Sequence, residues 1–300
     1  MKRITLYLSL LVFSCLFYLY APARQSDPKQ EYIKLKKKLA TGWNTWNTRS
    51  VLSHVLLPEA FSINLELEDG TSGRQLREAL IGRRGNGVET IRPGIHSYDG
   101  AYTELTLEWQ SIKLKVESAG KGKDLVILIT PLNKSAASRL LIRPALLWDK
   151  EGVITKTSDG FLAKLSSEDL ATHISRSIKD AKYKDSVFAL ASLEESIGIS
   201  LGNLRQMPEI EKIIKTARKE LLESYNKFPA VAEMHKAMQN VLAWDVIYEP
   251  THDRVIAPVS RIWSTDAKGW VIFDWDTYFA SWMFSLEDKE LALLQCYCNY

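Results

Sequence analysis

The sequence predicts an α+β, multidomain fold in which an N-terminal antiparallel β-sandwich precedes a helical region. Between residues 52 and 165 short apolar runs alternate with turn residues and no helical pattern intervenes, which is typical of a sandwich. After residue 202 the apolar residues recur at spacings of three and four, which indicates helices. The chain has 300 residues, 46% of them hydrophobic, so it is long enough to bury a core.

The N-terminus has the pattern of an export signal. Lys2 and Arg3 precede a mostly apolar stretch, residues 4–20, and Ala21-Pro22-Ala23 then forms a small-x-small cleavage pattern. We interpret residues 1–23 as a signal peptide of a periplasmic or secreted protein, with no stable membrane insertion after cleavage. Two alternatives stay open: a membrane anchor through residues 4–20, which have the minimum spanning length, and a lipoprotein signal at Cys15.

Charge and metal-ligand spacing exclude several classes of partner. The chain carries 39 Lys+Arg against 36 Asp+Glu, and its one dense basic run is residues 34–38, so nucleic acid is not an expected partner. The five histidines form no pair at a spacing of three or four, and Cys296 and Cys298 lie at the C-terminus. The sequence therefore predicts no metal site and no cofactor.

Residues 24–41 are predicted to form a short helix or linker, and residues 42–202 the sandwich. Residues 62–68 alternate with period two and end in the turn signal Asp69-Gly70. The apolar parity of residues 105–109 flips at residues 112–116, which predicts a hairpin across Gln110-Ser111. Residues 125–129 are continuously apolar, as in a strand covered on both faces. Residues 140–148 are a further candidate strand, with Pro144 at an edge or bulge.

Residues 203–300 are predicted to contain four helices. The first begins at Pro208, and the second begins at Pro229 and has Asp245 near its end. The third begins near Asp274, which could cap it, and carries Tyr278, Phe279 and Trp282. The fourth spans residues 287–294.

Tryptophan and aspartate are interleaved between residues 244 and 282, a combination that suits carbohydrate. A pyranose ring stacks its apolar CH face on indole while its hydroxyls bond to carboxylates. We interpret Trp244 and Trp282 as core positions, and Trp270 and Trp275, together with Trp263, as site candidates in a Gly- and Pro-containing segment. Asp274 and Asp276 would lie roughly 200° apart on a helix, so they do not form an acid/base pair by themselves.

A second cluster, residues 42–50, combines Trp43 and Trp46 with amides and Arg49. It is either part of a sugar site or a turn with two buried indoles.

Several of these segments resemble family 63 of the glycoside hydrolases, and more narrowly its bacterial mannosylglycerate-hydrolase-like and trehalase-like branch. The resemblance rests on residues 42–59, 92–94, 98–105, 258–261 and 273–279. It implies a β-sandwich followed by an (α/α)6 barrel, and inverting hydrolysis of an α-glycosidic bond by two carboxylates. Trp275-Asp276 with Phe279 resembles the segment that holds the sugar, with Arg261 or Trp270 nearby; Trp43, Trp46 and Arg49 are the next substrate-binding candidates.

We therefore expect an exported glycoside hydrolase of the α-glucosidase or α-mannosidase type with a carbohydrate substrate. The resemblance places both catalytic carboxylates further along the barrel, so no catalytic residue is assigned, and residues 203–300 are expected to be only part of that barrel. A chain truncated at residue 300 should have little or no turnover. The alternatives are a non-catalytic carbohydrate-binding β-sandwich and a purely structural envelope protein.

Overall fold

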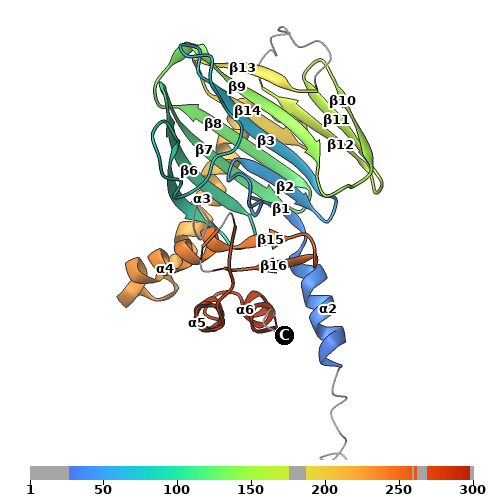
Figure 1. The fold of residues 1–300 in the computed structure, drawn as a ribbon, viewed down its shortest axis with the longest axis vertical. Helices are drawn as coiled ribbons and strands as arrows, with labels where there is room; N and C mark the ends of the chain where they lie inside the picture. Colours follow the sequence, from blue (N-terminus) through green and yellow to red (C-terminus); the bar gives the residue numbers. More distant parts are fainter. Residues whose placement is uncertain (1–26, 176–186, 259, 262–268, 298–300) are drawn as a thin grey trace, which may run out of the picture.

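The fold combines two large antiparallel sheets with a small number of helices, as the sequence predicts (Figure 1). The computed structural model describes residues 27–175, 187–258, 260–261 and 269–297. The predicted signal peptide and Trp263 lie outside these residues. Within them, no helix is both long and apolar enough to cross a membrane.

The first sheet contains the N-terminal strands. Its order is β1 (Gly42–Asn44), β2 (Ser53–Leu57), β3 (Phe61–Glu68), β9 (Ser135–Leu146) and β13 (Ala189–Leu193), and β4 (Gln75–Leu76) also pairs with β3. Pro144 was expected at an edge or bulge, yet β9 lies inside the sheet. Its β3 side pairs Pro144 with Ile63, whereas β13 begins at Ala189 opposite Ile142. On the β13 side Pro144 therefore has no registered partner, and its missing N–H costs no ladder bond there.

The second sheet is larger and contains the predicted hairpin. Its order is β10 (Gly152–Lys156), β11 (Gly160–Leu165), β12 (Asp169–Ile174), β14 (Ile197–Leu201), β8 (Asp124–Pro131), β7 (Ile112–Lys121), β6 (Tyr102–Trp109) and β5 (Thr90–His96). Trp109 pairs with Ile112, which leaves Gln110 and Ser111 as the two-residue turn. Gln110 has a φ of 52° and Ser111 is not among the residues with positive φ, so positive φ is confined to the first central residue of the turn, as in a type II′ turn.

One core fills the space between the two sheets. Phe61 and Ile63 of β3 contribute to it from one side, and Leu105 and Leu107 of β6 from the other, all at 1% exposure or less. The apolar parity read from the sequence is thus the inward face of each strand. This shared core confirms the sandwich-like packing of the sheets.

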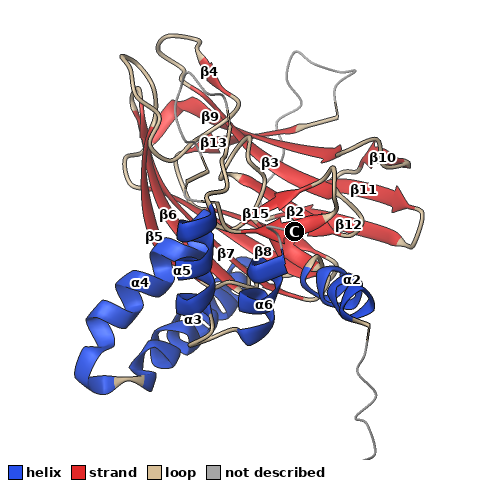
Figure 2. Ribbon diagram, turned by 60° about the horizontal axis from the view of Figure 1, so that its bottom comes forward, coloured by secondary structure: helices blue, strands red, loops and turns tan. Residues whose placement is uncertain are grey.

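The helices gather at one end of the sandwich (Figure 2). They are α2 (Pro28–Leu39), α3 (Met207–Ser224), α4 (Ala232–Asp245), α5 (Asp274–Phe284) and α6 (Lys289–Tyr297), with short 3-10 turns at Tyr225–Lys227 and Pro229–Val231 between α3 and α4. The four predicted helices after residue 203 are all present and begin no more than three residues from the expected start. They make up no closed barrel within the described residues, so the (α/α)6 barrel stays a prediction.

Helix α3 lies across the outer face of the second sheet. Val126 and Leu128 of β8 point away from the sandwich core and pack with Ile210 and Ile214 of α3. Their neighbours at odd positions, such as Ile127, face the core. The continuous apolar run predicted to be covered on both faces is therefore a strand between a sheet and a helix.

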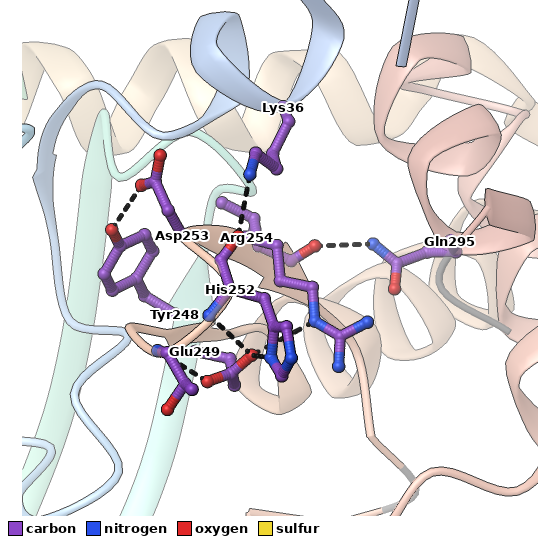
Figure 3. A network of polar contacts seen from close by, with 9 residues as sticks. Lys36, Tyr248, Glu249, His252, Asp253, Arg254 and Gln295 are labelled. Carbon is purple, nitrogen blue, oxygen red and sulfur yellow. Dashed lines mark hydrogen bonds and ion pairs between the residues drawn. The ribbon is translucent and has the colours of Figure 1, made fainter. Parts of the chain in front are cut away.

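A two-stranded hairpin, β15 (Ile247–Glu249) and β16 (Arg254–Ile256), connects the sandwich end to the helices (Figure 3). The buried carboxylate of Glu249 accepts hydrogen bonds from the Thr251 backbone N–H at 2.7 Å and from Arg254 Nε at 3.2 Å. It also lies 2.6 Å from His252 Nδ1. The Glu249 carboxylate thus holds the turn of the hairpin together.

Two helices bind this hairpin through its backbone (Figure 3). Lys36 of α2 donates to the His252 carbonyl at 2.7 Å, and Gln295 of α6 donates to the Val255 carbonyl at 3.3 Å. The Gln295 carbonyl in turn accepts the Ala257 N–H at 2.8 Å. The hairpin thus contacts both α2, the first described helix, and α6, the last described helix.

Candidate functional site

Four of the five aromatic side chains of helix α5 lie on its outer face, and the fifth, Phe284, is fully buried. Trp275 is 77% exposed and Trp282 73%, and Tyr278 and Phe279 between them are also exposed. Spacings of three, four and seven place all four on one face of a helix. Thr277 lies on the opposite face and is buried. The predicted helix thus exists, but its aromatic stripe points toward solvent.

The inner face of α5 combines the fully buried Phe284 with small polar side chains, and these fix the orientation of the helix. Ser281 is buried, and its hydroxyl donates to the Ala292 carbonyl of α6 at 2.6 Å and lies 3.0 Å from the Cys296 sulfur. Side chains of this size let α5 approach α6 closely, which the wide indole of Trp275 or Trp282 would prevent. The α5–α6 contact therefore fixes the orientation in which the aromatic face is exposed.

Two carboxylates lie in the first turn of α5, and both are exposed. The residue in the N-cap position is Phe273, not Asp274, and no side-chain capping bond is present. Asp276 follows Trp275 by one residue, so it flanks the aromatic face at about 100° around the helix axis. Asp274 lies roughly 200° from Asp276 on a regular helix, as expected, so the pair cannot enclose one bond.

Trp270 and Arg261, the two candidates predicted near α5, have buried or half-buried positions. Trp270 is half-buried against the apolar cluster that also contains Met283 of α5. Arg261 is only 6% exposed, and its guanidinium donates to the carbonyls of Trp244, Thr45 and Val246, the last two at 2.8 and 2.7 Å. Burial lowers the pKa of Arg261 to about 10, against the nearby Asp245 carboxylate. Most of its hydrogen-bonding capacity is thus used by the backbone.

The second predicted cluster is largely interior. Trp43 is 2% exposed, and its indole N–H donates to the Lys123 carbonyl at 2.8 Å. Trp46 is 3% exposed and packs in a different apolar cluster, whereas Arg49 is exposed on the turn between them and β2. The structure shows a turn with two buried indoles, one of the two interpretations of these residues. Neither indole has a face free for a ligand.

The interpretation of Trp244 and Trp282 as core positions is correct for the first and wrong for the second. Trp244 is 5% exposed and belongs to the sandwich core cluster, and its indole N–H donates to the Gly94 carbonyl at 2.7 Å. Trp282 has the helical spacing of a core residue, but α6 packs on the other face of its helix. Periodicity alone does not say which face of a helix is covered.

The exposed face of α5 is a platform and not part of a described cavity. Hollows of about 1220, 200 and 440 Å3 lie elsewhere, beside α3, beside Tyr98, and between α4 and β5. None of the three is lined by Trp275 or Asp276. A ligand at α5 would therefore stack on the surface, as an extended molecule with an apolar face can.

The described residues offer no metal site, and comparison with known proteins identifies no relative. Among the described residues no group of three or more His, Cys, Asp or Glu side chains is arranged to hold a metal ion. No protein-family model matches the chain, and no curated protein matches it.

Proposed function

We propose that the chain belongs to an exported glycoside hydrolase of the α-glucosidase or α-mannosidase type, and that helix α5 contributes a carbohydrate-binding surface. The proposal joins the resemblance to family 63 with one structural observation. That observation is the outward aromatic face of α5, with Trp275 and Trp282 both more than 70% exposed.

Carbohydrate fits this face better than an apolar partner because of the chemistry at its border. Trp275 and Trp282 are seven residues apart, so their indoles are separated by about 10 Å along the helix, a length that a short oligosaccharide spans. Asp276 beside them accepts hydrogen bonds from hydroxyl groups, which an apolar partner would leave unused. The sugar rings would stack on the indoles, and their hydroxyls would bind the carboxylate.

The test is a calorimetric titration of the protein with α-linked gluco- and manno-oligosaccharides of two to four units. We expect saturable binding that weakens roughly two- to tenfold in Trp275→Ala and in Trp282→Ala, because one aromatic stacking contact contributes about 0.5–1.5 kcal/mol. Asp276→Asn should weaken binding less, since the amide keeps one acceptor. Met234→Ala is the matched control: it removes an equally exposed side chain from α4.

Two results would contradict the surface on α5. Binding that persists in both Trp variants would move the sugar to another part of the molecule and would favour the alternative, a non-catalytic carbohydrate-binding β-sandwich. A dimer in sedimentation that dissociates in the Trp variants, with no sugar binding at all, would instead make the aromatic face a contact between copies of the chain.

A further inference from the structure

A cavity of about 440 Å3 lies between the last turn of α4 and strands β5 and β6, apart from the face of α5. Ile81, Ile95 and the indole of Trp244 form its apolar wall, and Glu104, Asn240 and Asp245 supply polar groups. This size and this mixture of a mainly apolar lining with a few convergent polar groups are typical of small-ligand sites.

Glu104 presents one unused carboxylate oxygen. Its Oε2 accepts hydrogen bonds from Lys115 and Arg218, each at 3.0 Å, and lies 3.0 Å from the Tyr102 hydroxyl, which Glu117 also accepts at 2.7 Å. Its Oε1 has no hydrogen bond among the described residues and lies on the side of Gly94, where a Cβ would stand 2.8 Å from it. Because Gly94 has no side chain, this oxygen stays accessible at the wall of the cavity as an acceptor.

Asn240 presents the complementary donors. Its Oδ1 accepts from the His96 backbone N–H at 3.1 Å and from the Tyr225 hydroxyl at 2.8 Å. Two donors on the same oxygen fix the orientation of the amide. Its Nδ2 therefore carries two N–H groups that bond to no residue in the described part of the chain.

The charges around the cavity are nearly balanced. Burial alone would raise the pKa of Glu104, but the hydrogen bonds from Lys115 and Arg218 outweigh it and keep the carboxyl ionised. Asp245 lies near the buried Arg261, and burial, opposed by Arg261, raises the pKa of Asp245 to about 6. An ionic ligand would find no uncompensated opposite charge here, whereas hydroxyl groups would find both acceptors and donors.

We propose that this cavity binds a neutral polyhydroxylated molecule of monosaccharide size, with its hydroxyls on Glu104, Asn240 and Asp245 and its CH groups against the apolar wall that Ile81, Ile95 and the accessible part of Trp244 form. The Trp244 indole is fixed in place: its N–H donates to the Gly94 carbonyl, His96 packs edge-on with ring centroids 4.7 Å apart, and the Arg261 guanidinium lies 6.0 Å from the ring centroid. The site shares no residue with the α5 surface and does not depend on the proposed function.

The test uses ligand-observed NMR with the full chain and four probes: glucose, mannose, glycerate as an anion and trimethylammonium as a cation. We expect saturable binding of at least one of the two sugars and not of the ions. Val241→Trp should weaken it at least tenfold, because Val241 lines the cavity and is 63% exposed, so a larger side chain can close the entrance without entering the core.

Met234→Trp is the matched control, since it adds the same side chain at an exposed position of α4 that does not line the cavity. Asn240→Asp keeps the size of the side chain and removes both N–H donors, so it should also weaken binding. The proposal is overturned if neither sugar binds, if glycerate or trimethylammonium binds more tightly, or if Val241→Trp and Met234→Trp behave alike. Loss of binding in Trp275→Ala would assign the signal to the α5 surface and would also overturn it.

Discussion

Helices α3 and α5 differ in how much of their large apolar surface they bury. Helix α3 packs Ile210 and Ile214 on the second sheet, and its charged residues face solvent. Helix α5 buries Thr277, Ser281 and Phe284 but exposes both of its indoles. Burial of apolar surface stabilises the position of α3, whereas α5 is positioned by one buried aromatic residue, Phe284, together with the hydrogen bond from Ser281 to α6. The difference teaches that an aromatic stripe at helical spacing marks a core only when another element covers it.

The largest expected effect is a difference in unfolding free energy between substitutions in the buried face of α3 and in the exposed face of α5. Ile210 is fully buried, so Ile210→Ala should lower the free energy of unfolding by about 2–5 kcal/mol. Phe279→Ala removes a larger side chain from the exposed face of α5 and should change it by about 0.5 kcal/mol or less. Urea unfolding of both variants checks this. Equal losses would mean that the α5 face is covered in solution.

Lowering the pH tests the stability of the buried core, because two histidines there are held uncharged. Burial lowers the pKa of His54 to about 4 and, with Arg261 nearby, that of His96 to about 3, from an ordinary value of 6.5. The unfolded chain takes up these protons below pH 6.5 and the folded chain does not. Each histidine should therefore remove about 1.4 kcal/mol of unfolding free energy per pH unit as the pH falls from 6.5 toward 4.

Asp245 acts in the opposite direction over part of this range. Its pKa of about 6 lies above the ordinary 3.8, so between these values the folded state holds a proton that the unfolded chain releases. In that pH range Asp245 should therefore cancel the loss of unfolding free energy that one of the two histidines causes. His54→Gln should reduce the slope of unfolding free energy against pH by about 1.4 kcal/mol per unit between pH 6 and 4.5. The slope above pH 7.5 should not change; an unchanged slope at low pH would show that His54 is already protonated in the folded state.

A further substitution tests the buried face of α5, where the small side chain of Ser281 contacts α6. Ser281→Leu should cost about 1–3 kcal/mol, because the added atoms separate α5 from α6 and the bond to Ala292 is lost. Ser285→Leu, one turn further and less buried, is the matched substitution and should cost less. Thermal unfolding of the two variants compares them. A greater loss at Ser285 would contradict the close contact between these helices.

Local patterns predicted the parts of the fold that depend on local chemistry. The parity flip at Gln110-Ser111 located a two-residue hairpin, and the continuous apolar run at residues 125–129 indicated a strand covered twice. Strands β15 and β16 have three residues each, too few for a period to be read. Partners distant in sequence were also invisible: Glu104 alternates outward from β6 like a solvent-facing residue, and only the packing of α3 brings Arg218 onto it.

The candidate site was predictable by composition and not by geometry. Trp275, Asp276 and Phe279 were recognised, and the structure places them at one end of an exposed helical face. Trp43 and Trp46 have the same residue type but are buried, since the sequence does not show which indoles the sheets enclose. Asp245 and Glu104 belong to different elements, and their shared cavity follows only from the fold.

The three acceptors of Arg261 are all backbone carbonyls, contributed by Thr45, Trp244 and Val246. Every amino acid supplies a carbonyl, so this junction places little demand on the identity of those three residues. It places a strict demand on Arg261, because lysine lacks the planar fork that reaches three acceptors at once. This contact alone would therefore let related chains vary at the acceptor positions while requiring arginine at the donor position.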